Sequence, residues 1–155
     1  MKGHSDILAK LDELLTHELS SADLYLAYSR TLQRKGYTKL YERLAHEADD
    51  EMRHAHLLTE RILLLEGTPD VLSRFEATPA TDPKGILEQA LRYELEVARM
   101  LNEAIALCDQ HDDAGTRTIL EQLLKDTEED HIDYLEAQLH LVAEVGLENY
   151  LAQQL

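Results

Sequence analysis

The chain has no tryptophan, one phenylalanine, three prolines and six glycines among its 155 residues. Such a shortage of helix-breaking residues, beside abundant Leu, Ala, Glu, Gln and Arg, favours helices, and strand-like runs of Val, Ile and Thr are missing. Cys108 is the sole cysteine, so an intramolecular disulfide is impossible, and its position three residues after Ile105 predicts a small buried side chain. We therefore expect an all-α protein.

Basic charge is also scarce, because 31 acidic residues face 15 basic ones and the formal net charge is −16. Such a surface repels nucleic acid, and no basic tail or patch offsets it. Acidity suits a protein that gathers cations, although many helical proteins are acidic for solubility alone. No apolar stretch reaches roughly 18 residues, and the N-terminus lacks the apolar region of a signal peptide. We expect a soluble cytoplasmic protein with neither a nucleic-acid nor a membrane partner.

Apolar residues recur at helical spacing in four long segments. Ser5 is the expected N-cap of the first segment, and Gly36 marks its end. Pro83, directly after Thr81 and Asp82, marks the start of the third. The predicted helices span residues 5–35, 38–67, 83 to beyond 105, and 114–144, with a short fifth helix over 147–155.

The connection over residues 68–82 has no helical periodicity and is long for a compact domain. Fully extended, it could reach about 50 Å at roughly 3.3 Å per residue. The helix before it would be about 40 Å long at roughly 1.5 Å per residue. The connection can therefore run the length of the bundle and leave the second and third helices parallel. We expect a four-helix bundle with one long crossover.

Acidic and histidine side chains interrupt the apolar seam of every long helix. Two of the interruptions are Glu-x-x-His pairs, and residues three apart share a helix face, so both side chains of a pair can reach one metal ion. The interrupting residues are Glu18 in the first helix, Glu51 and His54 in the second, Glu94 in the third, and Glu128 and His131 in the fourth.

The alternative to a metal site is that these four glutamates are simply solvated. Their places on apolar seams argue against it, because burying one unpaired carboxylate costs several kcal/mol and neighbouring carboxylates repel each other. Two divalent cations would balance four carboxylates, with neutral imidazoles completing the ligand set. Carboxylate and imidazole together suit Fe(II), Mn(II) or Zn(II). The pattern is typical of bundles that hold two iron ions.

Nearly the whole chain resembles the bacterioferritins. The matching stretches are MKG at the start, HEADDEMRHA at 46–55, ERILLLEGTP at 60–69, TEEDHIDYLE at 127–136 and GLENYL at 146–151. The resemblance implies a single ferritin-like domain over 1–155 whose ferroxidase ligands are Glu18, Glu51, His54, Glu94, Glu128 and His131. Glu51 and Glu128 would bridge two irons. Glu18 and His54 would complete one iron, and Glu94 and His131 the other.

The same resemblance implies an iron-storage function. Fe(II) would be oxidised by O2 or H2O2 and kept as a ferric mineral in a cage of two dozen subunits, of one type or mixed with a second ferritin subunit. Haem b at the two-fold interface would carry electrons inward for release, supplied by a bacterioferritin-associated ferredoxin.

Four further residues have two interpretations each. Met52, off the seam, is either a gap-filling side chain at a subunit contact or, as the resemblance implies, a haem axial ligand. His46 and Asp50 are either an exposed helix pair or an inner-surface iron site. Tyr25 is either a core residue or a redox-active group near the irons. The other histidines are expected at the surface, and they are His4, His17, His56, His111 and His140.

Three alternatives to a bacterioferritin remain open. A haem-free bacterial ferritin would differ mainly at Met52. A DNA-protecting mini-ferritin is disfavoured by the net charge, the lack of a basic arm and a site contained in one bundle. A di-iron oxygenase or a purely structural bundle would not assemble into a closed shell.

Overall fold

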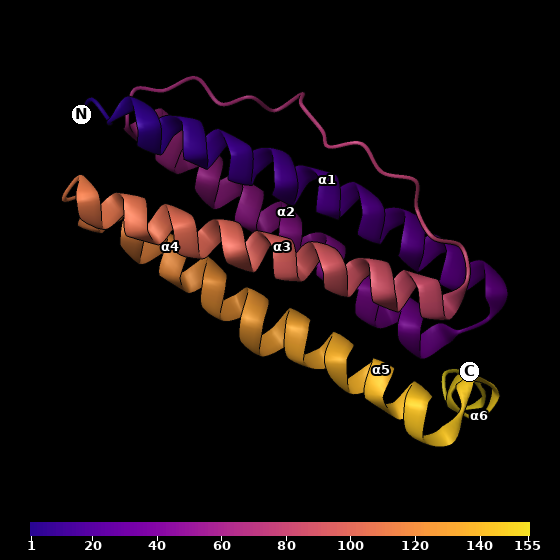
Figure 1. The fold of residues 1–155 in the computed structure, drawn as a ribbon. Helices are drawn as coiled ribbons and strands as arrows, with labels where there is room; N and C mark the ends of the chain where they lie inside the picture. Colours follow the sequence, from indigo (N-terminus) through magenta and orange to yellow (C-terminus); the bar gives the residue numbers. More distant parts are fainter.

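The computed structural model covers residues 1–155 and contains helices but no strands, which confirms the all-α prediction. Four long helical segments pack lengthwise, and a short helix lies across one end (Figure 1). The fourth segment is continuous but contains one wide π-helical turn. The elements are α1 (Ser5–Lys35), α2 (Thr38–Leu64), α3 (Pro83–Gln110), α4 (Ala114–Asp126), the π-helical turn Thr127–Ile132, α5 (Asp133–Val145) and α6 (Leu147–Ala152).

The helix ends mostly follow their local signals. Gly36 ends α1 in the left-handed conformation, with φ of 87°. Asp82 caps α3 by accepting a hydrogen bond from the Gly85 N–H, and Pro83 occupies the first helical position. The prediction of Ser5 as the N-cap of α1 is wrong by one residue: His4 is the cap, and its Nδ1 accepts a hydrogen bond from the Asp6 N–H at 3.2 Å.

The crossover between α2 and α3 runs along the outside of α1 for the length of the bundle, as predicted (Figure 1). Side chains of the helices hold its backbone in place. The Phe75 N–H donates a hydrogen bond to Ser20 Oγ at 3.0 Å, and the Ala80 N–H donates to Gln89 Oε1 at 2.8 Å. Because the crossover returns the chain to the end of the bundle at which α2 begins, α2 and α3 are parallel (Figure 1).

The apolar core is divided into two clusters by a polar layer halfway along the bundle. The first cluster contains Leu14, Leu58, Leu101 and Leu123 among its 15 buried residues, and Cys108 is buried there as predicted. The second has 12 buried residues, which come from the other half of the bundle. Buried glutamates and histidines occupy the layer between the clusters.

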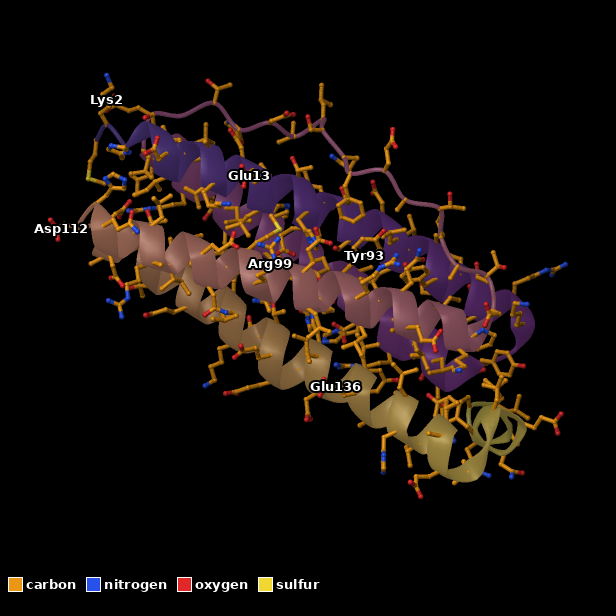
Figure 2. All side chains as sticks on the ribbon, viewed as in Figure 1. Lys2, Glu13, Tyr93, Arg99, Asp112 and Glu136 are labelled. Atoms are coloured by element: carbon orange, nitrogen blue, oxygen red, sulfur yellow. The ribbon has the colours of Figure 1, made fainter.

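Charged side chains cover the outside of the bundle. Glu13, Arg99 and Glu136 are exposed and project away from the helices (Figure 2). None of the helices combines the length and the apolar character that crossing a membrane requires.

A buried ion pair joins α2 to the start of α4. Arg61 donates hydrogen bonds to Thr116 Oγ1 at 2.8 Å and to Asp113 Oδ1 at 2.9 Å.

We expect Asp113→Ala to lower the free energy of unfolding by about 3 kcal/mol, because the Arg61 charge is left buried without a partner. Asp109→Ala, which removes an exposed ion pair with Arg117, should cost less than about 1 kcal/mol. Denaturant unfolding of both variants measures the difference, and equal small losses would contradict it.

The pKa of Asp113 determines the pH range of that contribution. Burial alone would raise this pKa, but the hydrogen bonds from Thr116 and the charge of Arg61 hold it below the usual range of aspartate. A carboxyl with a lowered pKa in the folded state stabilises the fold above its ordinary pKa. The Asp113 contribution is therefore complete at neutral pH and is lost as the pH falls through the lowered pKa.

Candidate metal centre

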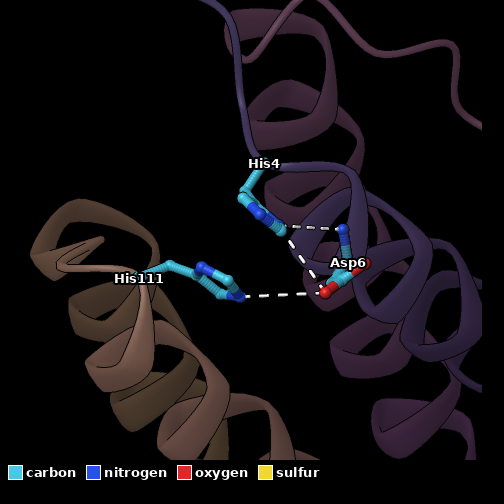
Figure 3. A group of neighbouring side chains, drawn as sticks. All are labelled: His4, Asp6 and His111. Atoms are coloured by element: carbon cyan, nitrogen blue, oxygen red, sulfur yellow. Dashed lines mark hydrogen bonds and ion pairs between the residues drawn. The ribbon is translucent and has the colours of Figure 1, made fainter.

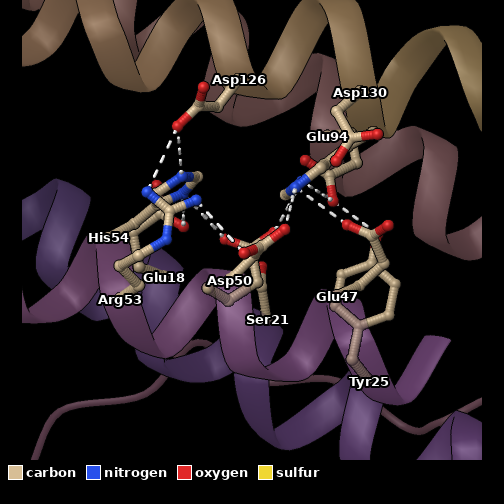
Figure 4. Close-up of polar contacts among 12 residues, drawn as sticks. Glu18, Ser21, Tyr25, Glu47, Asp50, Arg53, His54, Glu94, Asp126 and Asp130 are labelled. Carbon is tan, nitrogen blue, oxygen red and sulfur yellow. Dashed lines mark hydrogen bonds and ion pairs between the residues drawn. The ribbon is translucent and has the colours of Figure 1, made fainter. Parts of the chain in front are cut away.

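Five of the six predicted ligands meet in the polar layer of the bundle. Glu18 comes from α1, Glu51 and His54 from α2, Glu94 from α3, and His131 from the π-helical turn. Each is at most 2% exposed. Figure 4 shows Glu18 and His54 at one end of the layer and Glu94 at the other.

Glu51 lies between two half-sites and is shared by them. Its Oε2 is 3.5 Å from His54 Nδ1, and its Oε1 is 3.2 Å from His131 Nδ1. Glu18 Oε2 lies 3.7 Å from His54 Nδ1 on one side, and Glu94 Oε1 lies 3.3 Å from His131 Nδ1 on the other. One half-site is therefore Glu18, Glu51 and His54, and the other is Glu51, Glu94 and His131.

Several polar atoms of these residues are buried without a hydrogen-bond partner. They include both oxygens of Glu18, Oε2 of Glu94, and both ring nitrogens of His54 and His131. Buried polar atoms are almost always paired, because leaving them unpaired costs free energy. In each half-site the ligand atoms lie within 4.8 Å of one another. Carboxylate oxygens and imidazole nitrogens at this spacing can hold Fe(II), Mn(II) or Zn(II).

The side chains of the centre shift one another's pKa values. Burial raises the pKa of Glu51, and the nearby negative charge of Glu18 raises it further. Burial and then Glu51 raise the pKa of Glu94. Burial alone would lower the pKa of His54, but the adjacent carboxylates of Glu18 and Glu51 raise it to about 10. Burial therefore disfavours negative charge on these carboxylates unless positive charge lies beside them, and bound cations would supply it.

The prediction that Glu128 points into the bundle is wrong, because its side chain is exposed and belongs to neither half-site. The spacing of three to His131 places two residues on one face in an α-helix but not in a π-helix. In the π-helical turn the Asp133 N–H bonds to the carbonyl of Glu128 five residues earlier. This turn is wider than an α-helical turn, so residues three apart diverge. Thr127 occupies the inward position instead and is 1% exposed.

Four residues were expected to be either structural or functional, and the structure places them around the centre: Tyr25, His46, Asp50 and Met52. Tyr25 is buried, and its hydroxyl donates a hydrogen bond to Glu94 Oε1. Asp50 Oδ2 lies 3.3 Å from Nε2 of the exposed His46 and 3.7 Å from Nε2 of His131. Met52 is 39% exposed and lies off the seam of α2, as predicted. Tyr25 and Asp50 therefore contact the ligand set, and Met52 does not.

Sequence reasoning missed two carboxylates that reach the histidines from outside. Glu47 is 1% exposed, and its Oε2 lies 2.8 Å from His131 Nε2. Asp126 Oδ2 lies 3.5 Å from His54 Nε2. Glu47 precedes Glu51 by four residues, which places both on one face of α2, and this spacing is a signal that could have found it.

The prediction that His17 lies at the surface is wrong, because it is 4% exposed. Its ring packs against Phe75 of the crossover, with ring centroids 5.1 Å apart, and lies 6.2 Å from the Tyr93 ring. The crossover therefore covers a face of α1 that would otherwise be exposed. Burial lowers the pKa of His17. His56 and His140 are exposed, as expected.

A second group of potential ligands lies at the surface near the N-terminus. Asp6 Oδ2 is 3.8 Å from His4 Nδ1 and 3.8 Å from His111 Nε2 (Figure 3). The two rings stack with centroids 3.6 Å apart, so their in-plane lone pairs do not converge on one point. His4 Nδ1 also already accepts the capping hydrogen bond of α1. The group is better explained as a helix cap than as a metal site.

Comparison with known proteins agrees with the fold. The family described as "Ferritin-like domain" matches residues 8–145. Bacterial ferritin of Pseudomonas aeruginosa is 47% identical over 155 residues, with 100% of both chains covered. Bacterial ferritin of Synechocystis sp. is 45% identical over 155 residues, covering 100% of this chain and 99% of the relative. Bacterioferritin of Mycolicibacterium paratuberculosis is 41% identical over 153 residues, covering 99% and 96%. The chain therefore belongs to the ferritin family, a family of iron-storage proteins, and resembles its bacterial members along its whole length.

Proposed function

We propose that the protein is a ferroxidase that oxidises Fe(II) at the buried centre and stores the product as a ferric mineral. The observation that carries this proposal is the pair of half-sites sharing Glu51, whose buried polar atoms lack hydrogen-bond partners. Membership of the ferritin family supports iron as the substrate.

Reduction of the oxidant needs two electrons, which two neighbouring Fe(II) ions supply. Each ion gives up one electron, so that O2 and two protons become H2O2, or H2O2 and two protons become two molecules of water. The carboxylates of Glu18, Glu51 and Glu94 favour the product because each iron gains a positive charge. The imidazoles of His54 and His131 would bind the irons as neutral ligands.

Stopped-flow oxidation of Fe(II) by wild type and Glu94→Ala tests this function. Glu94 completes the half-site of His131, so we expect the fast phase to slow by at least about 100-fold, beyond the 10–100-fold typical of residues outside the ligand set. Glu96→Ala, an exposed residue of the same helix, is the matched control and should leave the rate unchanged. An unchanged fast phase in Glu94→Ala would remove the assignment of the centre.

Storage requires a closed shell, and we propose a 24-subunit cage, of one subunit type or mixed with a second. Size-exclusion chromatography should then show the mass of 24 copies of a chain of 17.7 kDa. A particle the size of a single bundle would favour a di-iron oxygenase or a structural bundle instead.

Two groups beside the centre have proposed roles in moving iron and electrons. Asp50 touches both the exposed His46 and the buried His131, so His46 and Asp50 could pass iron between the surface and the centre. Tyr25 is hydrogen-bonded to Glu94 and could supply an electron to the centre. A bacterioferritin-associated ferredoxin is the proposed external reductant for iron release.

Met52 is the proposed axial ligand of haem b at a two-fold subunit interface. Its side chain is exposed on α2 and is therefore free to bind haem together with Met52 of a second copy, and haem there would supply electron transfer. We expect protein produced with haem supplied to show a haem absorption spectrum that Met52→Leu loses, with Fe(II) oxidation unchanged. A wild-type protein that takes up no haem would support the alternative, a haem-free bacterial ferritin with the same ferroxidase activity.

A further inference from the structure

Both histidines of the centre have the same orientation relative to two kinds of carboxylate. Nδ1 of each ring faces the shared Glu51, at 3.5 Å for His54 and 3.2 Å for His131. Nε2 of each ring faces outward, to Asp126 at 3.5 Å and to Glu47 at 2.8 Å. Each imidazole is thus placed between an inner and an outer carboxylate.

The outer carboxylates matter because a neutral imidazole carries a single N–H. Coordination through Nδ1 requires the proton on Nε2, and an outer acceptor favours that tautomer, orients the ring and makes Nδ1 a better ligand. No other side chain satisfies the buried ring nitrogens of His54 and His131 by a hydrogen bond. Glu47 and Asp126 are the carboxylates closest to the two Nε2 atoms.

Each outer carboxylate is also paired with an arginine. Arg43 lies 2.7 Å from Glu47 Oε1, and Arg53 lies 3.5 Å from Asp126 Oδ2. Extra negative charge beside an acidic centre would destabilise the fold by electrostatic repulsion, and the positive charges of the arginines offset that repulsion. The two chains of contacts, His131–Glu47–Arg43 and His54–Asp126–Arg53, repeat one arrangement at the two ends of the centre.

We propose that Glu47 and Asp126 are positioning residues that hold His131 and His54 for metal coordination through Nδ1. This inference rests on the proposed ferroxidase function and adds to it how the two histidines are oriented. The effect is stronger at Glu47, which is buried and closer, than at Asp126, whose side chain is 32% exposed.

Co(II) titration of the assembled protein tests the inference, because Co(II) reports both affinity and ligand geometry through its visible spectrum. Wild type should bind two Co(II) per chain. Glu47→Gln should lower the affinity for one of the two Co(II) ions by about 10–100-fold and alter the spectrum of that ion. Asp126→Asn should lower the affinity for the other ion by a smaller factor. The conservative variants Glu47→Asp and Asp126→Glu should recover part of the loss. Asp49→Asn, an exposed neighbour on α2, is the control that should bind like wild type.

The possible outcomes distinguish this inference from the proposed ferroxidase function on which it rests. If wild type binds two Co(II) while Glu47→Gln and Asp126→Asn match it in affinity and spectrum, the positioning role is wrong and the ferroxidase proposal stands. If wild type binds no Co(II) at the centre, the proposed function itself fails. If either variant lowers the affinity for both Co(II) ions equally and also loses helix content by circular dichroism, the substituted residue has a structural role and the inference is overturned.

Discussion

Glu51→Gln is expected to abolish metal binding at both half-sites and to eliminate the fast phase of Fe(II) oxidation. Glu51 is the only residue that belongs to both half-sites, with one oxygen toward each histidine. Gln has the same shape but is neutral, so it removes the shared negative ligand without opening a cavity. We expect the rate to fall by more than about 100-fold, beyond the loss typical of residues outside the ligand set.

The comparison with Glu18→Gln makes that result specific. Glu18 belongs to one half-site, so its variant should keep one Zn(II) per chain in equilibrium titration, whereas Glu51→Gln should keep none. Glu60→Gln, exposed on the same helix as Glu51, should bind two. Two tightly bound Zn(II) ions in Glu51→Gln would contradict the sharing of Glu51.

Without bound metal, the buried charges of the centre should lower the free energy of unfolding of the protein. Glu18 and His54 are 0% exposed, and they lie beside a Glu51 carboxylate whose pKa is raised by burial and by Glu18. Replacing a buried charged pair by apolar residues of similar volume often stabilises a protein by about 1–4 kcal/mol. We therefore expect metal-free Glu18→Met/His54→Leu to unfold at a higher temperature than metal-free wild type.

Added Zn(II) should reverse that order. An ion present at about 100 times its dissociation constant stabilises the fold by about 2.7 kcal/mol per site. Wild type has two half-sites to fill, and the double variant has lost two of the three ligands of one of them. Calorimetric melting with and without Zn(II) measures both effects. A double variant that melts below wild type in the absence of metal would show that the pair stabilises the apo fold.

Local sequence signals were sufficient wherever a single helix decides the outcome. Pro83 after Asp82 and the left-handed Gly36 set helix ends that depend only on nearby backbone. The length of the 68–82 connection against that of α2 was enough to predict the crossover. Glu18, Glu51 and Glu94 lie on straight α-helical seams, so periodicity alone placed them inside.

Periodicity failed where the backbone leaves the α-helix. Glu128 and His131 fit an α-helical pair by spacing, but the π-helical turn rotates Glu128 outward while keeping Thr127 and His131 inside. A Glu-x-x-His spacing is identical in both helix types, so the motif cannot report which one forms. The fourth helix consequently supplies an outer carboxylate, Asp126, in place of the expected inner one.

By itself, the sequence determined the helical class, the crossover and the burial of five of the six candidate ligands, because each depends on spacing or length along one segment. Only the tertiary structure decided the exposure of Glu128, the burial of His17 under the crossover, and the contact of Glu47 with His131. The π-helical turn and the contacts between segments distant in the chain set these features, and neither follows from spacing along a single helix.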